Sequence, residues 1–214
     1  MKIPSPTALK AVLFVMFIMA LVSAPFVLFG EDFVLPLLKS RENQAGGLIV
    51  IAVMLLAADS VAPVPSTLVV MFLASKSGPV AGIIGGTVGL SIGVLAAGWI
   101  GRAAVGRMAP KFFPEAELAR LRESLQQRLA LTLACWRSVP VMAETTVIIA
   151  AAAGVPVRRI FWATLLPNFV VSVIYSVAAD DSAKTAILTF LATLVLSVAL
   201  WWIFGRRAGR SRKP

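Results

Sequence analysis

Six long apolar segments dominate this chain, and they restrict the solvent in which it can fold. Four of them contain no charged residue, at residues 11–29, 79–100, 160–179 and 186–204, with a kink expected at Pro167 in the third, where Asn168 would satisfy the freed backbone groups. At about 1.5 Å per residue, each is long enough to cross roughly 30 Å of hydrocarbon as a helix. Hydrophobic residues make up 59% of the chain and charged residues only 14%, which is more apolar surface than one aqueous core buries. The sequence predicts an all-α polytopic membrane protein.

The other two apolar segments are broken near their middles. Pro63 and Pro65 interrupt residues 48–74, and Pro140 interrupts residues 129–153. Proline lacks the backbone donor that continues a helix, so each segment should form two arms of about half a bilayer's length. We expect each to be a re-entrant helical hairpin, with these three prolines as the hairpin-breaking residues.

The distribution of charge favours hairpins over two further spans, because a hairpin returns the chain to the side it left. With two hairpins, the basic segment 102–128 and the basic C-terminal tail fall on one side. The acidic residues at 31–32 and 180–181 then fall on the other. Since basic loops stay in the cytoplasm, we expect four transmembrane helices plus two opposed re-entrant hairpins in an inverted repeat. Both termini would be cytoplasmic.

Segment 102–128 is the most polar internal part of the chain. Pro114 precedes Glu115 and Glu117, which suit a first helical turn, and leucines then recur every three or four residues. This pattern predicts a short cytoplasmic amphipathic helix on the membrane surface. The expected organisation is an N-terminal transmembrane helix with an external loop (1–45), a core with both hairpins (46–181), and a C-terminal transmembrane helix with a basic tail (182–214).

Three ionisable residues lie deep in the interrupted segments: Asp59, Arg137 and Glu144. Each would cost several kcal/mol if it faced lipid, so each should face a partner or a watery cavity. Asp59 and Glu144 are candidates for proton coupling, and Arg137 is a candidate for binding a lipid phosphate. The alternative is structural, with Arg137 and an acid holding the hairpins together.

Ser66 and Thr67 directly follow Pro65. They can cap the returning arm of the first hairpin, whose positive helix end would then lie within the membrane and suit an anion. Both are therefore further candidates for binding lipid phosphate, and ordinary helix capping is the alternative.

Several classes of function are disfavoured by composition. The chain has no histidine, which removes the usual proton shuttle, the commonest metal ligand and most nucleophile–base arrangements. We expect no enzyme, metal or cofactor. Cys135 is the single cysteine and is interpreted as a small buried hydrophobe. The net charge of +10 lies at the ends of apolar runs, where it serves topology, so nucleic-acid binding is not expected.

Several of these motifs together, over residues 46–181, resemble the DedA family, also described as the VTT or SNARE-associated membrane domain. They are the acid before a Pro-x-Pro break, the glycine-rich span ending in Gly101-Arg102, the run Arg137-Ser138-Val139-Pro140, and the stretch from Gly154 to Asn168. The resemblance implies proton-linked proteins of the plasma membrane, in bacteria the inner membrane, that move or scramble phospholipids or polyprenyl phosphates. It also implies essential acids and arginines in the hairpins.

The chain departs from the family pattern at two positions. Thr67 stands where an acid often follows the Pro-x-Pro turn, and Ala143, next to Glu144, stands where a second arginine is frequent. The resemblance is therefore to a divergent member.

The leading hypothesis is a proton-linked transporter or scramblase whose partners are protons and a phospholipid or polyprenyl phosphate. A homo-oligomer is left open. The alternative is a non-transporting membrane assembly or scaffold protein with structural buried charges. An intramembrane lipid-modifying enzyme is a weaker third hypothesis, because no nucleophile–base set is recognisable.

Overall fold

The computed structural model describes most of the central part of the chain. The described residues are 44–59, 64–137 and 141–179, with shorter pieces at 13, 16–20, 34, 36–41, 184–185, 187–189, 191–193 and 195. Within these ranges nearly every residue is helical and none lies in a strand, which confirms the all-α class. Pro63 and Pro140, and most of the expected first and last spans, lie outside the described residues.

The first interrupted segment forms two helices, α2 (Ala45–Ala58) and α3 (Ser66–Ser77), which pack against each other. Helix α3 ends at Gly78, whose φ of +89° is a left-handed conformation that glycine adopts without a steric penalty. Pro79 follows as the first residue of the next helix, where its missing N–H removes no hydrogen bond. The chain therefore reverses sharply and returns along α3.

The long helix that follows begins as α4 (Pro79–Ile100), with the bounds expected for this span. It does not stop there. It continues through a π-helical turn, η1 (Gly101–Val105), into α5 (Gly106–Phe112), so that the polar segment starts inside the helix. The apolar span expected at residues 79–100 thus coincides with α4, and helical structure extends beyond it into the polar segment as far as Phe112.

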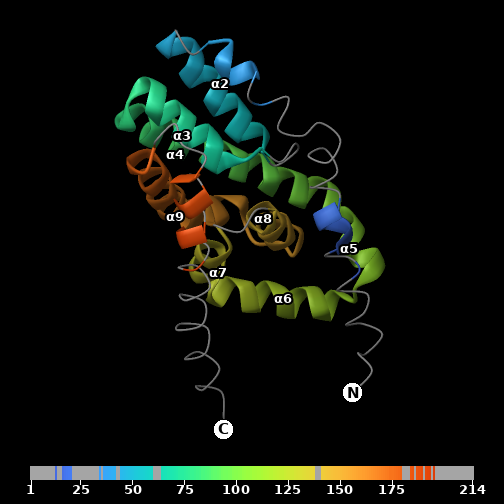
Figure 1. Ribbon diagram of the computed structural model, residues 1–214. Helices are drawn as coiled ribbons and strands as arrows, with labels where there is room; N and C mark the ends of the chain where they lie inside the picture. Colours follow the sequence, from blue (N-terminus) through green and yellow to red (C-terminus); the bar gives the residue numbers. More distant parts are fainter. Residues whose placement is uncertain are drawn as a thin grey trace.

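A short amphipathic helix, α6 (Glu115–Gln127), then lies across one end of the molecule (Figure 1). It begins after Pro114 and carries Glu115 and Glu117 in its first turn, as the sequence indicates. None of its residues is buried. Leu129, expected on the same helical face, instead begins the next helix and is buried.

The second interrupted segment forms α7 (Leu129–Trp136) and α8 (Met142–Ala152), which also pack against each other. Helix α9 (Val157–Val177) follows and runs through Pro167 without ending. Asn168 was expected to satisfy backbone groups freed at a kink. Its Nδ2 instead donates to the Ser91 Oγ on α4, at 3.2 Å.

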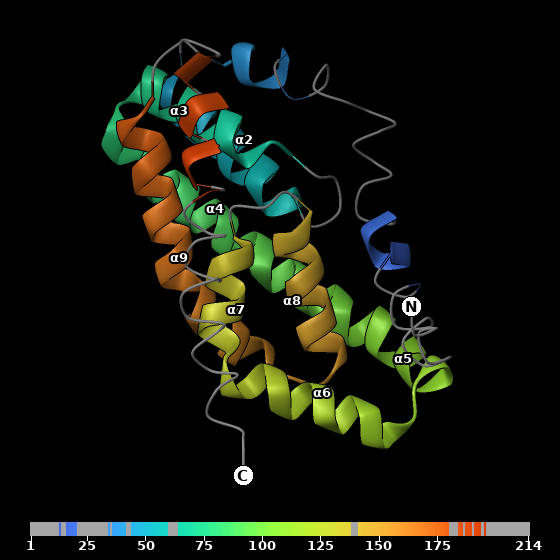
Figure 2. The same cartoon turned by 60° about the horizontal axis from the view of Figure 1, so that its bottom comes forward.

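Helices α4 and α9 pack along each other in the centre of the fold. Figure 2 shows α2 and α3 against one part of α4 and α8 beside its other part, while α7 packs against α8 and α9. The glycines of α4 allow this close approach: a Cβ at Gly82 would lie 2.5 Å from Ser176 Oγ, and one at Gly86 would lie 2.7 Å from Ser172 Oγ. Glycines repeated at three- and four-residue spacings, as at positions 82, 85, 86, 89 and 93, let other helices come near.

Large apolar side chains line the outer face of α4. Val80, Ile84, Val88, Ile92, Leu95 and Trp99 are all exposed. The stripe from Val80 to Trp99 is about 28 Å long, close to the thickness of a bilayer's hydrocarbon core. The two helices Pro79–Phe112 and Val157–Val177 are long and apolar enough to cross a membrane. The fold therefore has the general character of a membrane protein.

Candidate functional site

Asp59 lies at the break between the two helices of the first pair. It is the C-terminal cap residue of α2, and only 7% of its surface is exposed. Its Oδ1 accepts a hydrogen bond of 2.7 Å from the backbone N–H of Val64, just before α3 begins. The carboxylate therefore connects the two ends of the break and satisfies a buried donor that the interrupted helix leaves unpaired.

Arg137 and Glu144 lie on either side of the break in the second pair. Arg137 is the C-terminal cap residue of α7, and Glu144 is in the first turn of α8. Their side chains form an ion pair, with 3.7 Å between Nη1 and Oε1, and are 7% and 12% exposed. Each charge sits where the helix dipole favours it, with the cation at a C-terminus and the anion at an N-terminus.

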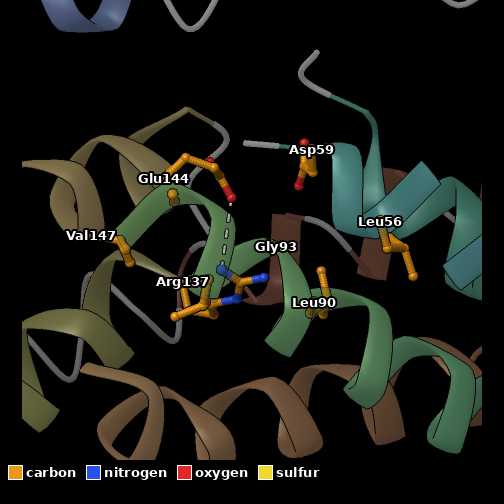
Figure 3. A pocket seen from close by; sticks show the side chains of 9 residues that line it. Leu56, Asp59, Leu90, Gly93, Arg137, Glu144 and Val147 are labelled. Atoms are coloured by element: carbon orange, nitrogen blue, oxygen red, sulfur yellow. Dashed lines mark ion pairs between the residues drawn. The ribbon is translucent and has the colours of Figure 1, made fainter. Parts of the chain in front are cut away.

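One pocket brings these three ionisable side chains together. Asp59 enters it from the first helix pair, Arg137 and Glu144 enter from the second, and Figure 3 shows Arg137 between the two pairs. The other lining residues are apolar or glycine: Leu56, Leu90, Gly93, Val94, Ala97 and Val147. The free space is about that of a single water molecule. The two breaks, 78 positions apart in sequence between Asp59 and Arg137, thus meet at one small polar site.

The cluster contains two carboxyl groups and one guanidinium, and Asp59 lies within electrostatic range of both Arg137 and Glu144. Arginine stays protonated in proteins. The cluster is therefore neutral when it holds one acidic proton and carries a charge of −1 when both acids are ionised. A net charge buried among apolar side chains is costly, so the number of protons that the cluster holds affects its stability.

Ser66 and Thr67 occupy the first turn of α3, half-buried, and neither lines the pocket. The expectation that they cap α3 was wrong. Pro65 takes the N-cap position, and no side-chain cap hydrogen bond forms, because both residues already lie inside the helix. Pro65 thus lies at the break between α2 and α3.

Gly93 is a site residue that the sequence did not single out. It faces the pocket from α4, where a Cβ would lie only 2.8 Å from the backbone oxygen of Leu56. The end of α2, and with it Asp59, can approach α4 only because this position has no side chain. The glycine spacing of residues 79–100 indicated close packing, but nothing in the sequence distinguished Gly93 from the other glycines.

A second buried polar group lies between α4 and α9. Asn168 is completely buried, and its Oδ1 has no hydrogen-bond partner. The described residues contain no group of His, Cys, Asp or Glu side chains that could hold a metal ion.

The chain matches no family model, no curated protein and no solved structure.

Proposed function

We propose that this protein is a proton-linked transporter or scramblase of phospholipids or polyprenyl phosphates, and a divergent member of the DedA family. One observation supports this most: two broken helix pairs, from separate halves of the sequence, meet at a buried Asp59–Arg137–Glu144 cluster. Intramembrane charges at such a junction typically mark a transport pathway.

The proposed layout has four transmembrane helices and two opposed re-entrant hairpins. Helices α2 and α3 have 14 and 12 residues, which corresponds to about 21 and 18 Å, too short to cross roughly 30 Å of hydrocarbon. Helices α7 and α8 are shorter still. In this proposal α4 and α9 are two of the full spans, both termini are cytoplasmic, and the membrane is a bacterial inner membrane.

Arg137 is the proposed contact for the lipid phosphate. A guanidinium can bind phosphate through two parallel hydrogen bonds. In this structure the Arg137 Nη1 lies 3.7 Å from the Glu144 Oε1. This ion pair is too long to include a direct hydrogen bond. A phosphate oxygen can replace the carboxylate as the partner of Arg137. The headgroup would then bind at the tips of the helix pairs while the acyl chains stay in the bilayer.

Glu144 and Asp59 are the proposed proton carriers. When a phosphate takes the place of Glu144 on Arg137, that carboxylate loses its cation in an apolar pocket. Uptake of a proton by Glu144 removes the uncompensated charge. Asp59, held by Val64 across the cluster, supplies the second exchangeable site. Binding of an anion and binding of a proton are therefore coupled through one guanidinium.

The structure corresponds to a closed state in this mechanism, because the pocket has room for only about one water molecule. A phosphate headgroup needs more space, so the two helix pairs must separate during transport. The first pair contacts α4 through both of its helices and the second pair through α8, so α4 would be the fixed element.

Reconstitution into liposomes tests the proposal. Fluorescent phospholipid and polyprenyl-phosphate probes are placed in one leaflet, with the internal pH set by buffer, and movement to the other leaflet is followed by quenching. We expect movement of at least one probe that depends on the pH difference. Arg120→Gln, a change of an exposed residue on α6, is the control and should behave as wild type. Proteoliposomes as inert as protein-free ones would contradict the proposal.

A second candidate is a non-transporting assembly or scaffold protein. It is favoured by one observation: Arg137 already has a partner, and little free space surrounds the pair. The charges would then only hold the helix pairs together. Inert proteoliposomes containing a well-folded protein would support this candidate.

A further inference from the structure

Two arginine–carbonyl contacts join helix α6 to α8 and α9, and Leu125 of α6 packs, partly buried, against the neighbouring apolar cluster. The Arg122 Nε donates to the backbone oxygen of Ala153, just after α8, at 2.7 Å. In the opposite direction, the Arg159 Nη2 on α9 donates to the backbone oxygen of Gln126 on α6, at 3.3 Å. Both acceptors are backbone carbonyls at the C-terminal end of a helix. Such carbonyls lack partners within their own helix and attract cations.

The backbone at Gly154 is shaped to receive Arg122. Gly154 has a φ of +91°, and a Cβ at this position would collide with the Arg122 guanidinium. Any other residue there would therefore be strained and would also push the arginine away. We call these two arginine contacts, with Gly154, the latch.

Helix α6 is also joined directly to the functional cluster. A single residue, Arg128, separates the end of α6 from the start of α7, and Arg137 is the cap residue that follows the eight residues of α7. The latch holds α6 to the end of α8, the helix whose first turn carries Glu144. One short helix thus fixes the outer ends of both helices that carry the Arg137–Glu144 ion pair. None of its own residues is fully buried, so its apolar contact with the core is limited to partly buried side chains such as Leu125.

We propose that α6 is a releasable strap, and that its latch sets the position of α7 relative to α8 and so regulates the Arg137–Glu144 pair. Release of the strap frees α7 to move Arg137 away from Glu144. The regulation of transport by α6 rests on the proposed function. The mechanical coupling between α6 and α7 can be measured without transport.

Cys135 is a natural reporter of this coupling. It is the single cysteine of the chain, it lies on α7 two residues before Arg137, and only 3% of it is exposed. Movement of α7 away from α8 and α9 exposes its thiol. The rate at which N-ethylmaleimide, a small uncharged reagent, labels the folded protein therefore measures the movement of α7.

The experiment compares Arg122→Gln with Arg120→Gln in the full-length protein. Each variant removes one positive charge from α6, but only Arg122 belongs to the latch. We expect Arg122→Gln to speed both hydrogen exchange of the α6 amides and labelling of Cys135 by about tenfold, the effect of losing one charge-assisted hydrogen bond. Arg120→Gln should match wild type in both. Arg159→Gln, which removes the weaker contact, should shift both rates in the same direction by a smaller factor.

Equal hydrogen-exchange rates of the α6 amides in Arg122→Gln and Arg120→Gln would show that the latch does not hold α6. Faster exchange of α6 with unchanged labelling of Cys135 would overturn the coupling between the strap and α7. Neither readout involves lipid movement, so inert proteoliposomes would refute the proposed function while these two rates still decide the inference about the strap.

Discussion

Replacing Asp59 by Asn and by Ala separates its structural contribution from its proposed role as a proton carrier. The Asp59 Oδ1 accepts the Val64 N–H at 2.7 Å in a buried environment. Asparagine keeps an acceptor oxygen at that position but cannot carry an exchangeable carboxylic proton. Alanine removes both. The two variants should therefore differ in stability and agree in activity.

The expected magnitudes follow from this one hydrogen bond. The Val64 N–H would be left unsatisfied between two helices, and an unsatisfied buried donor costs about 1–3 kcal/mol. Asp59→Ala should therefore lose about 1–3 kcal/mol of the free energy of unfolding, whereas Asp59→Asn, which keeps an acceptor, should lose less than about 1 kcal/mol.

The assay pairs unfolding in mixed micelles, titrated with a denaturing detergent, with pH-driven lipid movement in liposomes. We expect Asp59→Asn to be nearly as abundant and stable as wild type but inactive, and Asp59→Ala to be both less stable and inactive. Wild-type lipid movement by Asp59→Asn would remove Asp59 from proton coupling. Equal stability of the two variants would show that the Val64 hydrogen bond does not hold the break together.

Three further predictions concern packing, topology and the phosphate contact. Gly101→Ala should destabilise the protein by about 1–3 kcal/mol, because its Cβ would lie 2.5 Å from the backbone oxygen of Ile148. The control Gly46→Ala, whose Cβ would have nothing within 4 Å, should be neutral or slightly stabilising. Equal melting temperatures of the two variants in detergent would refute this prediction. Cysteines placed in Arg102–Arg128, in a variant lacking the native cysteine, should react with an impermeant reagent only from the cytoplasmic side, and labelling from outside would mean that at least one helix pair is a true span. Arg137→Lys should fold normally but lose most lipid movement, because lysine offers phosphate a single point charge instead of two parallel donors, and full activity would show that charge alone suffices.

The positions of the helices could be predicted from the sequence because prolines and apolar periodicity act locally. Pro65 determined where α3 begins, and the run from Pro79 to Ile100 matched α4 at both ends. The sequence did not predict features of the helices that depend on packing against neighbouring elements. The helix runs on past Ile100 through a π-helical turn at Gly101, where the backbone of α8 lies close, and no local signal in the polar segment indicates that packing.

The candidate site was predictable in its chemistry but not in its geometry. Burial of Asp59, Arg137 and Glu144 followed from their places in apolar segments, since an unpartnered charge there is costly. That Arg137 pairs with Glu144, while Asp59 binds Val64, depends on where the two breaks meet. The role of Gly93 was hidden for the same reason, because its importance comes from Leu56 on another helix. Ser66 and Thr67 were misassigned because a one-residue shift of the helix start decides which residue is the cap.

The central claim is that Arg137 binds the lipid phosphate and does not merely lock the two helix pairs together. Arg137→Gln alone strands Glu144 as a buried charge, at a cost of about 3–5 kcal/mol, which Glu144→Gln in the same molecule should largely restore by removing the unpaired partner.

The most direct measurement is therefore lipid movement by the Arg137→Gln, Glu144→Gln double variant in liposomes, with its unfolding free energy measured on the same preparation. We predict a protein of near wild-type stability that moves no lipid. A stable double variant that moves lipid at the wild-type rate would contradict the phosphate role and leave the ion pair as a structural contact.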